Sequence, residues 1–354
     1  MAKHPPPIIY LLILGALGWG TWQLVVFWRN SSDPQPTCNA SDRSGCSDPG
    51  SSPSQLTNAS APEFFREVTS VPSGVFNYGG STTWAPIRLE VDSVIQTVWP
   101  DFMLRYTDPV AAPPGSGTGI RMLLDNQLSF SQSSRPLKSE EYAEAETRGF
   151  ALVEIPTAID GIAVAVHPGL AVEGITVTQL RDIYLGRIRN WQEVGGPDLS
   201  ITPYSRDPEA GGTVEFFIEN VLEGESLSPT VEITQNTTLS LRAVARNPGG
   251  IYYASAPEVI PQCTVKGLAI GRNSGEWVSP FQGSYVPPSR CPARRNRLHV
   301  TAFRTGDYPI TRRLFVIVKD NNQTDEQAGR AYADLLLTDQ GQELIEQAGF
   351  VAIQ

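Results

Sequence analysis

Three short turns of similar composition recur where an extended stretch of this chain runs into a helical pattern. Each combines glycine with serine or threonine, at residues 80–83, 115–119 and 210–213. A helix that begins at such a turn presents unpaired backbone N–H groups and the positive end of its dipole. Glycine lets the backbone approach a ligand closely, and the hydroxyls add further donors. Each turn is therefore a candidate anion site.

Extended stretches alternate with stretches whose apolar residues recur at helical spacing. The expected strands cover residues 74–78, 102–106, 128–131, 161–166, 200–204, 251–254 and 314–318. The expected helices cover the apolar positions of residues 87–98, 120–124 and 214–222, followed by 177–184, 325–337 and 340–348. Such alternation indicates α/β lobes and not a β sandwich. The long polar segment 261–297 is interpreted as an elaborated loop.

Length and composition set limits on the class of protein. A chain of 354 residues, 40% apolar and 18% charged, is long enough for two lobes that each have a core. The formal net charge of −10, with no basic block to offset it, argues against a nucleic-acid partner. It does not argue against an anionic ligand, because local donors hold a small buried anion.

The N-terminal region predicts a membrane segment and a tether. Residues 8–28 form an uncharged, largely apolar run of about bilayer-spanning length. Residues 1–29 are either a cleavable signal peptide or an uncleaved signal anchor, and the long run without a small-x-small cleavage site favours the anchor. The rest of the chain would then lie on the periplasmic or extracytoplasmic face. Residues 30–73 are rich in serine, proline, aspartate and glycine, which predicts a flexible linker.

Four cysteines form two sequence-near pairs, Cys38 with Cys46 and Cys263 with Cys291. In an exported protein they are candidates for disulfides, although the sequence does not prove the pairing. Neither pair has the spacing of metal ligands and the chain has only three histidines, so we expect no metal and no cofactor. A hydrolase built on a serine would need a base, and with histidine so scarce we expect no enzymatic activity.

A set of motifs follows one family in order and spacing over about 280 residues. The motifs are GSTTWAP (80–86), GSGTG (115–119), SSRPL (133–137), AIDGIA (158–163), LRDIYLGRIRNW (180–191), SR (205–206) with GGT (211–213), and the stretch 341–350. In these the chain resembles the phosphate-binding proteins that feed ABC phosphate transporters. Such collinearity is far more specific than any single turn.

The resemblance implies a two-lobe, hinged, type II-like binding fold over residues 74–354, closing on a dehydrated phosphate. The first lobe would comprise about 74–160 plus 300–354, and the second about 161–299. The implied function is extracytoplasmic capture of inorganic phosphate and its delivery to an ABC permease, without catalysis. Two alternatives remain open, namely binding of another oxyanion such as sulfate or arsenate, and a phosphate-sensing ectodomain that does not transport.

The resemblance also implies a set of phosphate-binding positions. They are Thr82, Thr83, Ser116, Gly117, Thr118, Ser134, Arg135, Arg206, Gly211, Gly212 and Thr213.

Two of these positions depart from the family. Ser134 stands where well-known members carry an aspartate that accepts a proton from phosphate and so rejects sulfate. Gly211 stands where a serine is usual, one residue further from Arg206. A serine does not repel a deprotonated oxyanion as a carboxylate does, so discrimination would need an acceptor elsewhere. The candidates are Asp160, Asp207 and Glu209.

Overall fold

The structure is a computed structural model that describes residues 62–110, 112–208 and 211–353. These residues belong to one compact unit, 58–354. The expected membrane segment 8–28, most of the expected linker and the Cys38–Cys46 pair lie outside the described residues. Inside the described ranges, no helix combines the length and the apolar character that a membrane crossing needs.

The strands follow the order β2-β1-β3-β10-β4-β8-β6-β7, with β9 paired to β4 and β5 paired to β9. The first strands, β1, β2 and β3, are parallel to one another, whereas β10 is antiparallel to both β3 and β4. The bounds are β1 Gly74–Gly80, β2 Phe102–Tyr106, β3 Phe130–Ser133, β4 Ala151–Val166, β5 Gly174–Thr176, β6 Thr202–Arg206, β7 Glu232–Thr234, β8 Gly250–Ser255, β9 Lys266–Gly271 and β10 Thr311–Asp320.

Helices cover these strands in two groups; the first packs on two hydrophobic clusters and the second on one. The first group comprises α1 Ala85–Val98, α2 Ser116–Leu124, α3 Ser139–Thr147, α9 Thr324–Leu336 and α10 Asp339–Gln347. The second comprises α4 Val177–Tyr184, α5 Gly212–Asn220, α6 Thr237–Arg246, α7 Ala256–Val259 and α8 Val300–Thr305. The short 3-10 helices are η1 Phe65–Glu67, η2 Thr82–Trp84, η3 Trp191–Val194 and η4 Pro288–Arg290.

The first lobe, built on β1, β2 and β3, has a core rich in aromatic rings. Tyr78, Phe130 and Tyr332 pack face to face, with the Phe130 and Tyr332 ring centroids 4.9 Å apart. Trp84 is fully buried beside them, and its indole N–H donates to the Ser133 carbonyl oxygen at 3.0 Å. This bond ties η2 to the end of β3, so that two of the predicted binding turns lie side by side.

The second lobe, built on β5 to β9, has a separate core. Tyr184, Phe217 and Tyr253 are buried there, and the Phe217 and Tyr253 rings stack 3.6 Å apart. Phe217 belongs to α5, so this stacking fixes α5 on its own lobe. The helix α4 has the predicted bounds, and its predicted N-cap Thr176 accepts from the Gln179 backbone N–H at 3.0 Å.

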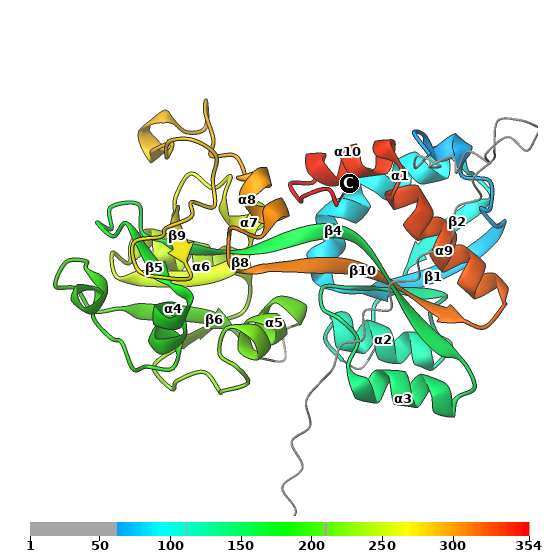
Figure 1. The fold of residues 1–354 in the computed structure, drawn as a ribbon, viewed down its shortest axis with the longest axis horizontal. Helices are drawn as coiled ribbons and strands as arrows, with labels where there is room; N and C mark the ends of the chain where they lie inside the picture. The colour runs from blue at the N-terminus through cyan, green and yellow to red at the C-terminus, as the bar shows by residue number, and fades with distance from the viewer. Residues whose placement is uncertain (1–61, 111, 209–210, 354) are drawn as a thin grey trace, which may run out of the picture. The chain divides into compact units, whose positions relative to one another are not determined.

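Two long strands pass between the lobes (Figure 1). The first half of β4 pairs with β10, and its second half pairs with β8 and β9. The sequence predicted only 161–166 of this strand, since Glu154, Pro156 and Asp160 interrupt the apolar run over 151–160. Pairing with β10 nevertheless extends it.

Three further features differ from or add to the sequence interpretation. Segment 261–297 is not loop throughout, because it contains β9, in which Gly267 and Gly271 flank a short apolar run and hid the strand signal. A disulfide bond joins Cys263 to Cys291 in this segment, with their Cα atoms 5.6 Å apart. Phe65, within the range expected to be linker, is fully buried in the first core.

Candidate functional site

The first turn of α5 packs directly on the loops of the first lobe. The helix lies on the side of the second lobe that faces the first (Figure 1). A β-carbon on Gly212 would clash with Ser134 Oγ and lie 2.9 Å from Ser116 Oγ, and Gly211 has a φ of 109°. The lack of a side chain on Gly212 allows the close approach, and Gly211 adopts a backbone conformation that favours glycine. The glycines at this turn therefore serve contact between the lobes.

Three serine hydroxyls gather beneath Gly212. Ser81 Oγ donates to Ser134 Oγ at 2.9 Å, and the Ser116 and Ser134 hydroxyls lie 3.2 Å apart. The Ser134 backbone N–H also donates to Ser116 Oγ at 3.1 Å. All three serines are fully buried. The cluster joins the ends of β1 and β3 to the start of α2.

Arg312 was not among the predicted site residues, yet it lies at the centre of the contact between the lobes. Its Nε and Nη2 donate to Asp160 Oδ2 at 2.9 and 2.8 Å. Nη2 also donates to Thr83 Oγ at 3.1 Å and to Thr213 Oγ at 2.9 Å, while Nη1 donates to the Gly212 carbonyl oxygen at 2.9 Å. One guanidinium thus holds the expected binding threonines of both lobes.

The register of β4 and β10 explains this position, because Arg312 and Asp160 are directly paired across the two strands. The second Asp160 oxygen accepts from Ser255 Oγ at 2.6 Å. Both carboxylate oxygens are therefore engaged within the protein. Asp160 is therefore a structural partner of Arg312 and Ser255, and an acceptor role toward a ligand stays a prediction.

A cavity of about 330 Å³ adjoins this network. Four predicted site residues line it, namely Thr82, Thr83, Arg206 and Thr213, and they come from both lobes. Three hydroxyls and a guanidinium are donors suited to the oxygens of an anion.

Glu258 also lines this cavity, and the sequence interpretation did not single it out. Glu258 is exposed as a residue, yet the protein around the cavity removes part of the water from its carboxyl group. This desolvation raises the pKa of Glu258 above its ordinary value, and the charge of Asp160 adds to the increase. A hydrogen bond with Thr237 and the positive charge of Arg206 act in the opposite direction.

The remaining predicted residues lie apart from the lining of the cavity. Ser116 and Ser134 are engaged in the hydroxyl cluster, and Thr118 Oγ donates to the Pro113 carbonyl oxygen at 3.0 Å. Gly117 lies next to the Arg135 guanidinium, which would be 3.3 Å from a β-carbon there.

Arg135 has its own ionic partners. Its Nη2 lies 2.7 Å from Glu141 Oε1, and its Nε lies 3.1 Å from Glu215 Oε1. Glu141 lies in the first turn of α3 in the first lobe, whereas Glu215 belongs to α5 in the second. Two carboxylates thus balance the charge of this arginine.

Of the acceptors proposed for discrimination, Asp207 is exposed beyond the end of β6. Glu209 lies outside the described residues.

A family model for the PBP superfamily domain matches residues 67–340. The chain belongs to the PBP superfamily. Among its curated relatives, the phosphate-binding protein PstS of Staphylococcus epidermidis is 28% identical over 242 residues, which are 67% of this chain and 68% of that protein.

Solved structures with the same fold agree with this membership. A putative phosphate ABC transporter substrate-binding protein from Clostridium perfringens, solved with bound phosphate, aligns with a TM-score of 0.61 and 24% identity over 79% of this chain and 100% of its own. An ABC-type phosphate transport receptor from Vibrio cholerae aligns with a TM-score of 0.59 and 21% identity over 78% of this chain and 99% of its own. The predicted two-lobe α/β binding fold is confirmed.

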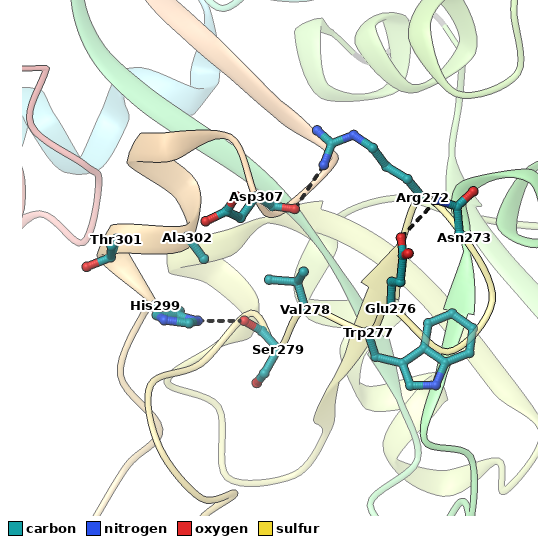
Figure 2. Close-up of a pocket in the computed structure, with 10 residues that line it drawn as sticks. All are labelled: Arg272, Asn273, Glu276, Trp277, Val278, Ser279, His299, Thr301, Ala302 and Asp307. Carbon is teal, nitrogen blue, oxygen red and sulfur yellow. Dashed lines mark hydrogen bonds between the residues drawn. The ribbon is translucent and has the colours of Figure 1, made fainter.

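A second hollow of this PBP superfamily chain, of about 480 Å³, contains none of the predicted site residues. Figure 2 shows three pairs of its polar groups bonded to one another. Arg272 donates to the Asp307 carbonyl oxygen at 3.1 Å, Asn273 donates to Glu276 at 2.8 Å, and His299 Nδ1 lies 3.2 Å from the Ser279 carbonyl oxygen. The cavity beside Arg312 is the better candidate, because donors from both lobes converge there. Among the described residues no group of acidic, histidine or cysteine side chains is arranged to hold a metal ion.

Proposed function

We propose that this protein captures inorganic phosphate outside the cytoplasm and delivers it to the permease of an ABC transporter. The observation that carries the proposal is the cavity in which Thr82, Thr83, Arg206 and Thr213 converge from the two lobes. The names of the Staphylococcus epidermidis and Clostridium perfringens proteins support phosphate as the ligand. No step of this function needs catalysis, since binding and release are sufficient.

In the proposed complex, donors of both lobes replace the hydration shell of phosphate. Arg206 contributes a planar guanidinium, whose charge-assisted bonds are the strongest of the set. Thr83 and Thr213 are oriented by Arg312 before the ligand arrives, which lowers the entropic cost of binding. Because one ligand bonds to both lobes, it stabilises the closed arrangement.

The other predicted positions differ in the roles that we propose for them. We propose that Ser116, Ser134, Gly211 and Gly212 hold the start of α5 against the first lobe. Direct phosphate contacts from these residues, and from Gly117, Thr118 and Arg135, stay predictions. So does the division into lobes at about residues 160 and 300.

Titration calorimetry with phosphate tests the proposed ligand. The wild-type protein should bind phosphate, and Arg206→Ala should weaken binding by up to about 100-fold, as expected for loss of bonds to a charged ligand. Arg313→Ala is the matched control, because Arg313 is an exposed arginine on β10 and its loss changes the net charge equally. No phosphate binding by the wild type, or equal affinities in the two variants, would overturn the proposal.

Delivery and anchoring are tested in cells. We infer that residues 8–28 anchor the chain in the membrane, so the protein should fractionate with membranes and leave them when this segment is deleted. Loss of phosphate uptake on deletion of the whole protein supports delivery to a permease. Unchanged uptake with an altered phosphate response would instead identify a sensor.

A further inference from the structure

The cavity beside Arg312 contains one acidic side chain among several donors. Hydroxyl, amide and guanidinium groups make up most of its polar lining, and Glu258 is the single carboxylate among the described lining residues. The hydroxyl and amide groups can donate to any oxyanion of suitable size, and they carry no charge that repels a fully deprotonated one. The carboxylate is therefore the lining group whose chemistry can distinguish one oxyanion from another.

The fold holds Glu258 at this place. It belongs to α7, which follows β8 directly, and the last residue of β8, Ser255, is bonded to Asp160. The helix also packs on β4, the strand that carries Asp160. Glu258 is therefore held by elements that are themselves fixed to the strands between the lobes.

The surrounding charges leave Glu258 as the negative group of the cavity. Asp160 on β4 is balanced by Arg312 on β10 at 2.8 Å. Arg206 on β6 and Thr237 on α6 are the other groups that act on the Glu258 carboxylate. Among the described residues Glu258 forms no salt bridge, so a ligand near Arg206 is within the influence of a carboxylate that is not held in a close ion pair of that kind.

We propose that Glu258 determines which oxyanion the cavity accepts, by accepting a hydrogen bond from a protonated oxyanion and repelling a fully deprotonated one. The inference rests on the proposed phosphate-binding function. An ionised carboxylate has acceptors and no donor, so it pairs with the P–OH group of phosphate. Sulfate has no such proton near neutral pH. The negative charge of the Glu258 carboxylate would repel it, and the carboxylate would be left without a hydrogen-bond donor.

The same geometry predicts a dependence on pH. The pKa of Glu258 is raised by desolvation and by Asp160, so the carboxyl takes up a proton at a higher pH than an ordinary glutamate. Once protonated it becomes a donor, and it no longer repels sulfate. Sulfate affinity should therefore rise as the pH falls toward the raised pKa, and it should not depend on the protonation of sulfate itself.

The test compares phosphate and sulfate titrations of the wild type, Glu258→Gln and the control Glu232→Gln. Glu232 is an exposed glutamate on β7 whose substitution removes the same charge from a residue that does not line the cavity. We expect Glu258→Gln to weaken phosphate binding and strengthen sulfate binding, each by about 10-fold, because an amide donates where the carboxylate repelled. Glu232→Gln should keep the wild-type ratio.

The outcomes separate this inference from the proposed function. An unchanged phosphate-to-sulfate ratio in a Glu258→Gln protein with wild-type thermal unfolding would overturn the inference alone. The pH dependence can be measured on the wild type without any variant. A wild-type sulfate affinity that stays constant as the pH falls would also overturn the inference. Failure of the wild type to bind phosphate would instead overturn the proposed function.

Discussion

Two ion-pair networks connect the lobes, and they differ in burial. The buried pair, Arg312 with Asp160, lies on the strands that pass between the lobes, and its side chains are 1% and 0% exposed. The rim network consists of Arg135 and Lys138 from the first lobe and Glu215 and Glu219 from α5. Its Lys138–Glu219 contact is 35% and 40% exposed, and in its Arg135–Glu215 contact the arginine is 4% and the glutamate 26% exposed.

The difference in burial implies a difference in role. Arg312 and Asp160 are neighbours in a continuous strand pair, so their contact can persist while the lobes move apart. The rim contacts require α5 to lie against the first lobe and can be made and broken with closure. The buried pair therefore supports the fold and orients the binding threonines, whereas the rim network contributes to closure alone.

The largest expected effect comes from Arg312→Met, which should lower the free energy of unfolding by about 3–5 kcal/mol. The substitution leaves the Asp160 carboxylate buried with only Ser255 as a partner. It also releases the Thr83 and Thr213 hydroxyls, so phosphate affinity of the folded fraction should fall. Denaturant unfolding and calorimetry measure the two effects separately.

A double-mutant cycle tests whether the pair itself is responsible. Adding Asp160→Asn to Arg312→Met removes the uncompensated charge and should recover at least about 1 kcal/mol. If Arg312→Met unfolds within about 1 kcal/mol of the wild type, the buried pair is not what supports this part of the fold.

The same contrast separates what sequence can predict from what it cannot. The turns that supply Thr82, Thr83, Arg206 and Thr213 were predictable, because glycine, hydroxyls and helix starts are local signals. Arg312 was not, because its partner Asp160 lies 152 residues away and only the strand register joins them. The one available signal was a charged residue at the start of an apolar strand.

Glu258 and the rim contacts were hidden for a similar reason. Glu258 lies on a four-residue helix with no distinguishing pattern, and its place in the cavity depends on tertiary packing. Arg135 was predicted as a ligand from its motif, but the pattern could not show that Glu141 and Glu215 balance its charge. The alternation of strands and helices sufficed for the fold class, whereas the first half of β4 required its pairing with β10.

An intermediate effect is expected from Glu215→Gln. Glu215 Oε1 accepts from Arg135 Nε at 3.1 Å and from Lys138 Nζ at 2.9 Å. It therefore joins both cations of the rim network to α5. Its loss should cost about 1 kcal/mol of closure, or roughly fivefold in phosphate affinity, while Arg135 keeps Glu141. Unfolding of the first lobe should be little changed.

Glu144→Gln is the control for that measurement. Glu144 pairs with Arg148 at 2.6 Å inside the first lobe. The substitution therefore removes an exposed ion pair that does not connect the two lobes. Its phosphate affinity should equal that of the wild type. If Glu215→Gln and Glu144→Gln bind phosphate equally, the rim network has no part in closure.

The smallest effect is expected from Lys138→Met, because Lys138 is 35% exposed, its partners are 26% and 40% exposed, and solvent screens these contacts. We expect a loss below about 0.5 kcal/mol, or about twofold in affinity at low salt. At 1 M salt the screening length is about 3 Å, so this loss should vanish, whereas that of Arg312→Met should persist. Calorimetry over a salt series measures both. A Lys138→Met effect as large as that of Glu215→Gln, and insensitive to salt, would show that the rim is desolvated like the buried pair, and the distinction between fold support and closure would no longer hold.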